Sequence, residues 1–132
     1  MLQLFSLVFW VPAIFLARIS AQDLSAKSEA TAMFNRILDH AKNHQLSELL
    51  SNFEEDFRFE DCNEVCNAER FTWYYMDNRK YEDFHMYPVD EARWTSEKRD
   101  EIEMKVVALY QRLKFVIRKS GGWKFVSGKK IC

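Results

Sequence analysis

The chain has 132 residues, of which 48% are hydrophobic and 15% aromatic, and its formal net charge is -1. A composition this apolar excludes an intrinsically disordered chain, and the length suits a single compact domain. Because there is no overall positive field, nucleic acid is not expected as a partner.

The charges are nevertheless distributed unevenly along the chain. Residues 48–64 contain seven acids and one base, whereas residues 111–132 contain seven bases and no acid. Strands of opposite charge pair better than strands of like charge, so the two segments are expected to lie side by side. The alternative is two faces that are solvated separately.

The first residues have the pattern of a targeting segment. Leu2–Ala17 is almost wholly apolar and is followed by Arg18, Ile19, Ser20 and Ala21. This pattern predicts a secretory signal peptide over residues 1–21, a domain over residues 22–132, and a secreted, extracellular protein. A short membrane anchor is the alternative, but a span needs about twenty apolar residues. No stable membrane span is therefore expected after cleavage.

Three cysteines, Cys62, Cys66 and Cys132, follow this segment. In an oxidising compartment they predict one disulfide bond and one remaining thiol. The Cys62–Cys66 spacing is not a zinc pattern, and His40 and His44 lack a third ligand, so no metal is expected. No glycine-rich phosphate loop or serine-centred elbow occurs, so no cofactor is expected either.

The first half of the chain predicts three helices and one strand. Asp23–His44 has apolar residues at helical spacing, with Ser25 or Ser28 as the cap, and Leu46–Phe53 predicts a second, shorter helix. Residues 57–62 alternate apolar and charged, as in a strand with one buried face. A third helix is predicted from Ala68 to about Asp77, capped by Asn67, and its apolar side is formed by Phe71, Tyr74 and Tyr75.

The second half is richer in strand patterns. Tyr81–Val89 predicts a strand that Ala92–Thr95 continues, whereas Ser96–Leu113 fits a strand and a helix equally well.

Leu113–Cys132 predicts a β-hairpin. A two-residue turn would place Lys119 opposite Lys124, with like charges facing each other. A three-residue loop, Ser120–Gly122, instead pairs Lys119 with Trp123, Ile117 with Phe125 and Val116 with Val126, and it keeps the apolar set on one face.

The order of these elements resembles a known family. The residues that carry the resemblance are 49–53, 56–62, 115–118, 123–128 and Cys132. Over residues 22–132 the chain resembles the nuclear transport factor 2-like superfamily, in its small, secreted, cysteine-containing branch.

The resemblance implies an α+β roll, in which a cone-shaped, strongly bent mixed β-sheet wraps around a long N-terminal helix. It implies that Ser96–Leu113 is mostly strand and that the first strand lies beside the last. It also implies a disulfide between Cys62 and Cys132, with a Cys66–Cys132 bond as the second choice.

The family fold alone does not assign a function. Its members include isomerases and dehydratases, which transfer protons from a pocket Asp or His, and they also include non-catalytic binding and dimerisation modules. The catalytic candidates are Asp61 and His85. The residues expected to line the core or a pocket are Phe57, Phe59, Trp73, Tyr74, Phe115, Ile117, Trp123 and Phe125.

The preferred interpretation is a secreted, non-enzymatic binding module for an apolar small molecule or a protein partner, using the cone pocket or the sheet face. Sheet-edge or sheet-face contact would give a homodimer. An acid/base enzyme of the isomerase or dehydratase type is the alternative. A cystatin-like protease inhibitor is a remote third candidate, because its Gln-x-Val-x-Gly loop and Pro-Trp hairpin are missing.

Overall fold

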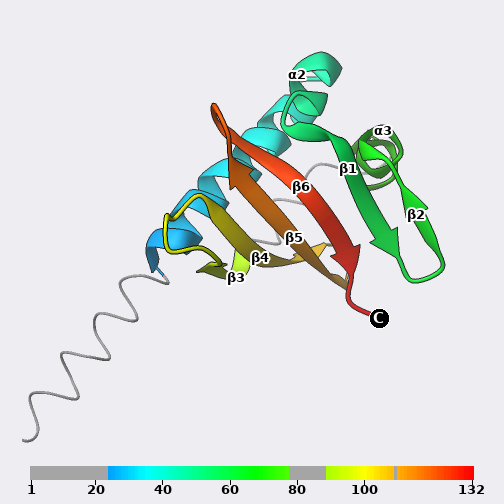
Figure 1. Cartoon of the computed structure of the whole chain (residues 1–132). Helices are drawn as coiled ribbons and strands as arrows, with labels where there is room; N and C mark the ends of the chain where they lie inside the picture. Colours follow the sequence, from blue (N-terminus) through cyan, green and yellow to red (C-terminus); the bar gives the residue numbers. More distant parts are fainter. Residues whose placement is uncertain (1–23, 78–88, 109) are drawn as a thin grey trace, which may run out of the picture.

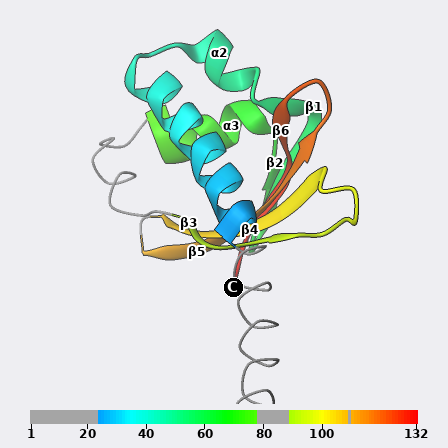
Figure 2. The same cartoon turned by 90° about the vertical axis from the view of Figure 1, so that its left-hand side faces the viewer.

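The computed structural model of the chain describes residues 24–77, 89–108 and 110–132. A long N-terminal helix, residues 24–42, lies against a six-stranded mixed sheet with the strand order β2-β1-β6-β5-β4-β3 (Figure 1). The sheet is strongly bent, and its concave face wraps around the helix (Figure 2). This is the α+β cone that the family resemblance implies. No helix in the described part of the chain is long and apolar enough to cross a membrane.

The N-terminal helix buries the apolar stripe that its sequence predicts. The buried side chains recur at helical spacing, and they are Ala26, Ala30, Met33, Phe34, Ile37, Leu38 and Ala41. Ser25 and Ser28 lie inside the helix, so the prediction that one of them caps it is wrong.

The second helix is shorter than predicted, and the first strand is longer. Helix α2 is Leu46–Leu50, and strand β1 already begins at Phe53 and runs to Asp61. The side chain of Asn52 explains the boundary, because its Nδ2 donates to the carbonyl oxygens of Glu48 and Leu49 at the end of α2. These bonds satisfy carbonyls that a longer helix would have used. Phe53 then pairs with Phe125 of the last strand.

Strand β2, Glu64–Cys66, leads into helix α3, Ala68–Thr72, which continues as the π-helix η1, Trp73–Asp77. The predicted cap is confirmed, because Asn67 Oδ1 accepts from the backbone N–H of Arg70 at 3.0 Å. The predicted apolar side is wrong at one position, since Tyr74 is 42% exposed. One turn of a π-helix contains more residues than one turn of an α-helix. Tyr74 and Tyr75, which α-helical spacing would place on the same side as Phe71, therefore point in different directions.

The second half of the chain is a meander of four antiparallel strands. They are β3 Val89–Trp94, β4 Glu101–Ala108, β5 Gln111–Lys119 and β6 Trp123–Lys130. Ser96–Leu113, whose pattern fits a strand and a helix, is therefore mostly strand from Glu101 on, as the family resemblance implies. The predicted strand Tyr81–Val89 lies outside the described residues except for Val89.

The β5–β6 hairpin has the predicted three-residue loop. Lys119 lies opposite Trp123 and Ile117 opposite Phe125. Gly121 takes a φ of +69°, a left-handed conformation that glycine adopts without a steric penalty. The predicted pairing of Val116 with Val126 is wrong. Val116 pairs with Ser127, because a register shift lies between Val116 and Ile117.

The acidic and basic segments lie side by side, as the charge pattern predicts. Strands β1 and β6 are parallel neighbours, with Glu60 opposite Lys129. Beyond their ends, Cys62 and Cys132 form a disulfide bond with Cα atoms 6.0 Å apart. The pairing implied by the family resemblance is therefore the one in the structure.

The concave face of the sheet is filled by aromatic rings. The buried phenylalanines that meet there are Phe53, Phe57, Phe59, Phe71, Phe115 and Phe125. Phe59 and Phe71 have ring centroids 4.7 Å apart, and Phe115 and Phe125 meet edge to face at 5.4 Å. Gly128 makes room for this packing, because a Cβ at that position would lie only 2.6 Å from the Phe115 ring and 2.9 Å from the Phe59 ring.

Replacing Gly128 by alanine tests this packing. Because the added methyl group would push two buried rings, we expect Gly128→Ala to lower the free energy of unfolding by about 1–3 kcal/mol. Urea denaturation measures the change. An unfolding curve that coincides with that of the unaltered protein would show that the aromatic layer is looser than the structure indicates.

The disulfide bond closes a loop between residues 70 positions apart. In the chain-entropy model, a loop of this length stabilises the folded state by about 4 kcal/mol. The double substitution Cys62→Ser with Cys132→Ser is expected to remove most of that stabilisation. A loss of less than about 1 kcal/mol in the same titration would contradict this assignment.

Candidate functional site

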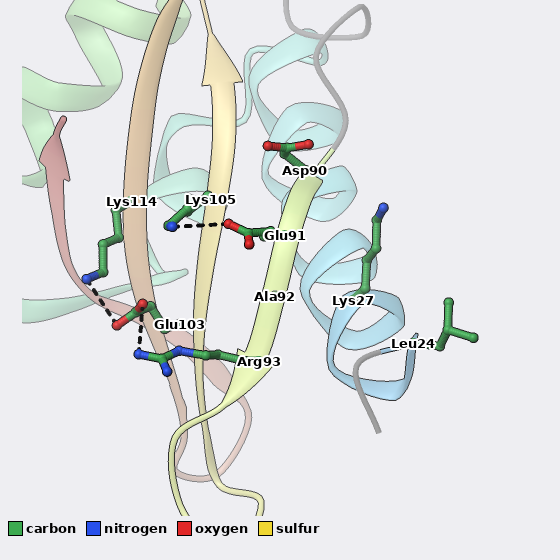
Figure 3. A pocket seen from close by; sticks show the side chains of 9 residues that line it. All are labelled: Leu24, Lys27, Asp90, Glu91, Ala92, Arg93, Glu103, Lys105 and Lys114. Carbon is green, nitrogen blue, oxygen red and sulfur yellow. Dashed lines mark hydrogen bonds and ion pairs between the residues drawn. The ribbon is translucent and has the colours of Figure 1, made fainter. Parts of the chain in front are cut away.

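Two hollows on the molecule differ in chemistry. The larger one, about 660 Å³, lies along the edge strand β3 beside the start of the N-terminal helix (Figure 3). Its wall is charged and already paired: Glu103 binds Lys114 at 3.2 Å and Arg93 at 3.3 Å, and Glu91 binds Lys105 at 3.1 Å. An apolar ligand would have to desolvate these ion pairs, so this hollow does not suit one.

The second hollow has a different lining, and we call it the aromatic crevice. It encloses about 270 Å³ between the end of β1, strand β2 and the α3–η1 helix, and it is lined by Phe59, Asp61, Glu64, Cys66, Arg70, Phe71, Trp73, Tyr74 and Tyr75. The segments that form it are neighbours in Figure 1.

Aromatic side chains form both the floor and the rim of the crevice. Phe59, Phe71 and Tyr75 are buried, with the rings of Phe71 and Tyr75 5.0 Å apart. The Tyr75 hydroxyl donates to Gln111 Oε1 at 3.1 Å, which fixes this ring against β5. At the rim, Trp73 is 53% exposed and Tyr74 42% exposed. A rigid apolar floor under two partly solvated rings can hold a flat apolar group.

The polar groups of the crevice surround the free thiol of Cys66. Burial raises the pKa of this thiol above its ordinary value, and the charges of Glu64 and Asp61 add to the rise, whereas Arg70 opposes it. Cys66 is therefore a protonated, weakly nucleophilic thiol at neutral pH. It is the one cysteine of the chain outside a disulfide bond.

Asp61, one of the two predicted catalytic residues, lies at the edge of the crevice. Its Oδ1 accepts from the backbone N–H of Cys62 at 2.8 Å and lies 3.9 Å from Lys130 Nζ. These contacts tie the carboxylate to the end of β1 and to β6, and its side chain is about one-third exposed. The other candidate, His85, lies outside the described residues.

The predicted lining residues fall into two groups in the structure. Buried side chains of the concave face are Phe57, Phe59, Phe115, Ile117 and Phe125. Trp73 and Tyr74 instead stand at the rim of the crevice. Trp123 is half-buried at the hairpin, where its ring lies 6.0 Å from that of Trp94.

The two histidines at the end of the N-terminal helix are not arranged as metal ligands. His40 Nδ1 lies 3.0 Å from Asn52 Nδ2, and the amide orientation of Asn52 is fixed because its Oδ1 accepts from Arg36 Nε at 2.9 Å. His40 Nδ1 is therefore occupied as an acceptor. Among residues 24–77, 89–108 and 110–132, no group of three or more His, Cys, Asp or Glu side chains could hold a metal ion.

Glu64, Cys66 and Arg70 line the crevice but were not predicted to belong to a site. One feature of the sequence points to them. The unpaired cysteine stands just before a predicted helix that contains three successive aromatic residues, Trp73–Tyr75. The π-turn that sends Trp73 and Tyr74 outwards and Tyr75 inwards has no such signal, so the crevice could not be assembled from sequence alone.

Comparison with known proteins identifies the fold. No family model and no curated protein matches the sequence. Among solved structures, a nuclear transport factor 2-like protein of unknown function from Shewanella oneidensis matches with a TM-score of 0.55 at 9% identity, over 78% of this chain and 96% of that one.

Two further structures have similar backbones. A domain of unknown function with a cystatin-like fold from Nostoc punctiforme has a TM-score of 0.53 at 13% identity, over 80% of this chain and 76% of that one. A de novo designed protein with a curved β-sheet has a TM-score of 0.58 at 16% identity, over 80% and 98%. The chain thus has the nuclear transport factor 2-like, cystatin-like fold.

The environment of Cys66 predicts how its reactivity depends on pH. Only the thiolate reacts with iodoacetamide, and the pKa of this thiol is raised. The alkylation rate should therefore reach half its maximum at a higher pH than for an exposed cysteine. Removing a negative charge with Glu64→Gln should move that midpoint down, and removing a positive charge with Arg70→Gln should move it up. A midpoint at or below that of an exposed cysteine would contradict the described burial.

Proposed function

We propose that this protein is a secreted, non-enzymatic binding module that holds an apolar group, from a small molecule or from a protein partner, in the aromatic crevice. The observation that carries the proposal is the position of Trp73 and Tyr74. Two large rings stand partly in solvent over a hollow with a buried aromatic floor. Burying such rings against a ligand supplies much of the free energy of binding at typical recognition sites.

The packing of the cone supports a site at its edge. The concave face is occupied by phenylalanine rings in mutual contact. A ligand between the N-terminal helix and the sheet would have to displace this aromatic core. The aromatic crevice, in contrast, is open at its rim and accepts a ligand with its backbone already in place.

The environment of Asp61 favours binding over acid/base catalysis. A general base needs a carboxylate that is desolvated and free to take a proton from the substrate. Asp61 is instead partly solvated, and it is held by the Cys62 N–H and by Lys130. We infer that Asp61 holds the end of β1 in place.

Secretion is supported by the apolar segment Leu2–Ala17 and by the disulfide bond. Disulfide bonds persist in oxidising compartments and are rare in the cytosol. N-terminal sequencing of the protein released by a eukaryotic secretion host tests this part of the proposal, with a mature chain that begins at Gln22 as the expected result.

Binding by the crevice can be tested with the neutral, environment-sensitive dye Nile red. The folded protein should raise its fluorescence, and Trp73→Ala should weaken the affinity at least about tenfold, which corresponds to about 1.4 kcal/mol. Native mass spectrometry of the secreted protein provides a second readout, in which co-purified apolar molecules should be lost from the variant.

The matched control is Tyr110→Ala, which removes an aromatic ring that is 93% exposed in the turn between β4 and β5 and is not among the residues that line the crevice. This variant should bind the dye as the unaltered protein does. Equal affinity of the Trp73→Ala variant and the unaltered protein would place any binding outside the crevice and would contradict the proposal.

A further inference from the structure

The convex face of the sheet carries a row of like charges across three neighbouring strands. The strand register places Lys105 of β4 directly opposite Lys114 of β5, and Lys114 directly opposite Lys129 of β6. Neighbouring strands are about 5 Å apart, so these three residues adjoin one another on one face of the sheet. Like charges directly opposite each other destabilise a sheet. In the next row on the same face, like charges do not meet, because Glu103 of β4 lies opposite the uncharged Val116 of β5.

The acids near this row pair with two of its three lysines and neutralise it only in part. Glu91 is bound to Lys105, and Glu103 is shared between Lys114 and Arg93. Glu60, opposite Lys129 on the outer side, is the remaining acid next to the row.

Two arginines enlarge the positive surface. Arg112 lies two residues before Lys114 on the same face of β5. Arg58 of β1 lines a shallow hollow of about 340 Å³, in which three bases, Arg58, Lys114 and Lys129, outnumber two acids, Glu60 and Glu103. Within the described residues, Arg58, Arg112 and Lys129 form no ion pair. We call these two arginines and the three lysines the basic patch.

We propose that the basic patch binds a sulfated polysaccharide. A chain of sulfate groups lying across the strands would supply anions to Arg58, Arg112 and Lys129, the bases of the patch that form no ion pair within the described residues. The positive charge of the patch therefore favours a polyanion as its ligand, even though the net charge of the whole protein is -1.

The rest of the convex face argues against other partners. Between the bases lie Val116, Ser127 and Gly128. There is no aromatic ring among these residues for a nucleic-acid base to stack on. A protein interface of ordinary affinity has an apolar, aromatic centre depleted in lysine, which this face lacks. A second copy of the chain would bring its own basic patch against this one, so the patch also disfavours a homodimer through this face.

The test uses the folded, disulfide-bonded protein and heparin as the probe. The unaltered protein should be retained on immobilised heparin at physiological ionic strength and should elute as the salt concentration rises, because salt screens these contacts. The double variant Arg112→Gln with Lys129→Gln removes two bases that form no ion pair in the described structure. Its affinity for a heparin oligosaccharide should fall about tenfold or more, as expected for the loss of two charge contacts.

The matched control, Lys42→Gln with Lys98→Gln, removes the same charge from the N-terminal helix and from the turn between β3 and β4. It should bind heparin as the unaltered protein does, and circular dichroism should show both variants folded. Flow-through of the unaltered protein at physiological salt would overturn the proposal, as would an equal loss of affinity in the control. Displacement of the protein from heparin by single-stranded DNA or polyglutamate at equal charge concentration would also overturn the assignment to a sulfated polysaccharide.

Discussion

The parallel pairing of β1 with β6 is the contact on which the rest of the structure depends. These are the first and the last of the described strands along the chain, and β1–β6 is the one parallel pair among them. The pairing attaches the meander β3–β6 to the segment that holds α2, β2 and α3. Bringing such distant segments together has an entropic cost, and opposite charges, the stacked rings of Phe53 and Phe125, and the disulfide bond offset it.

Both surfaces to which we assign binding follow from this pairing. The aromatic crevice lies where β1 ends, and its floor includes Phe59, whose neighbours Phe71 and Phe115 come from a helix and from the meander. The basic patch exists because β6 lies between β1 and β5, which places Lys129 beside Lys114. The aromatic core fills the concave face, so recognition is assigned to the edge and the outside of the cone.

Much of the fold was predictable from local patterns. The spacing of Ala30, Phe34 and Ile37 predicts the N-terminal helix, and avoidance of a Lys119–Lys124 pair predicts the hairpin loop. The family resemblance was needed for Ser96–Leu113, where helix propensity and strand alternation conflict, and for the choice of Cys132 as the partner of Cys62. The early start of β1 at Phe53 was missed, because the pairing with Phe125 is a long-range contact that overrides local helical spacing.

The candidate site was less predictable than the fold. The expected place of Asp61, Trp73 and Tyr74 is a cone pocket, whereas the structure places them at the crevice. The π-turn decides which of three successive aromatic residues faces solvent, and no residue type marks it. The basic patch is equally hard to predict from sequence, because Lys105, Lys114 and Lys129 become neighbours only through the strand register.

Amide hydrogen exchange, followed residue by residue in the native protein, tests the β1–β6 pairing most directly. If this ladder holds the two halves together, the amides that donate between β1 and β6 should exchange only through global unfolding, with the same opening free energy as the amides of the β4–β5 pair. One of them is the amide of Phe125, which donates to the carbonyl oxygen of Asn52, directly before β1, at 2.8 Å. Exchange of the β1 amides through a separate opening, at a much lower free energy than those of β4 and β5, would show that the sheet is stable without this contact and would contradict the account.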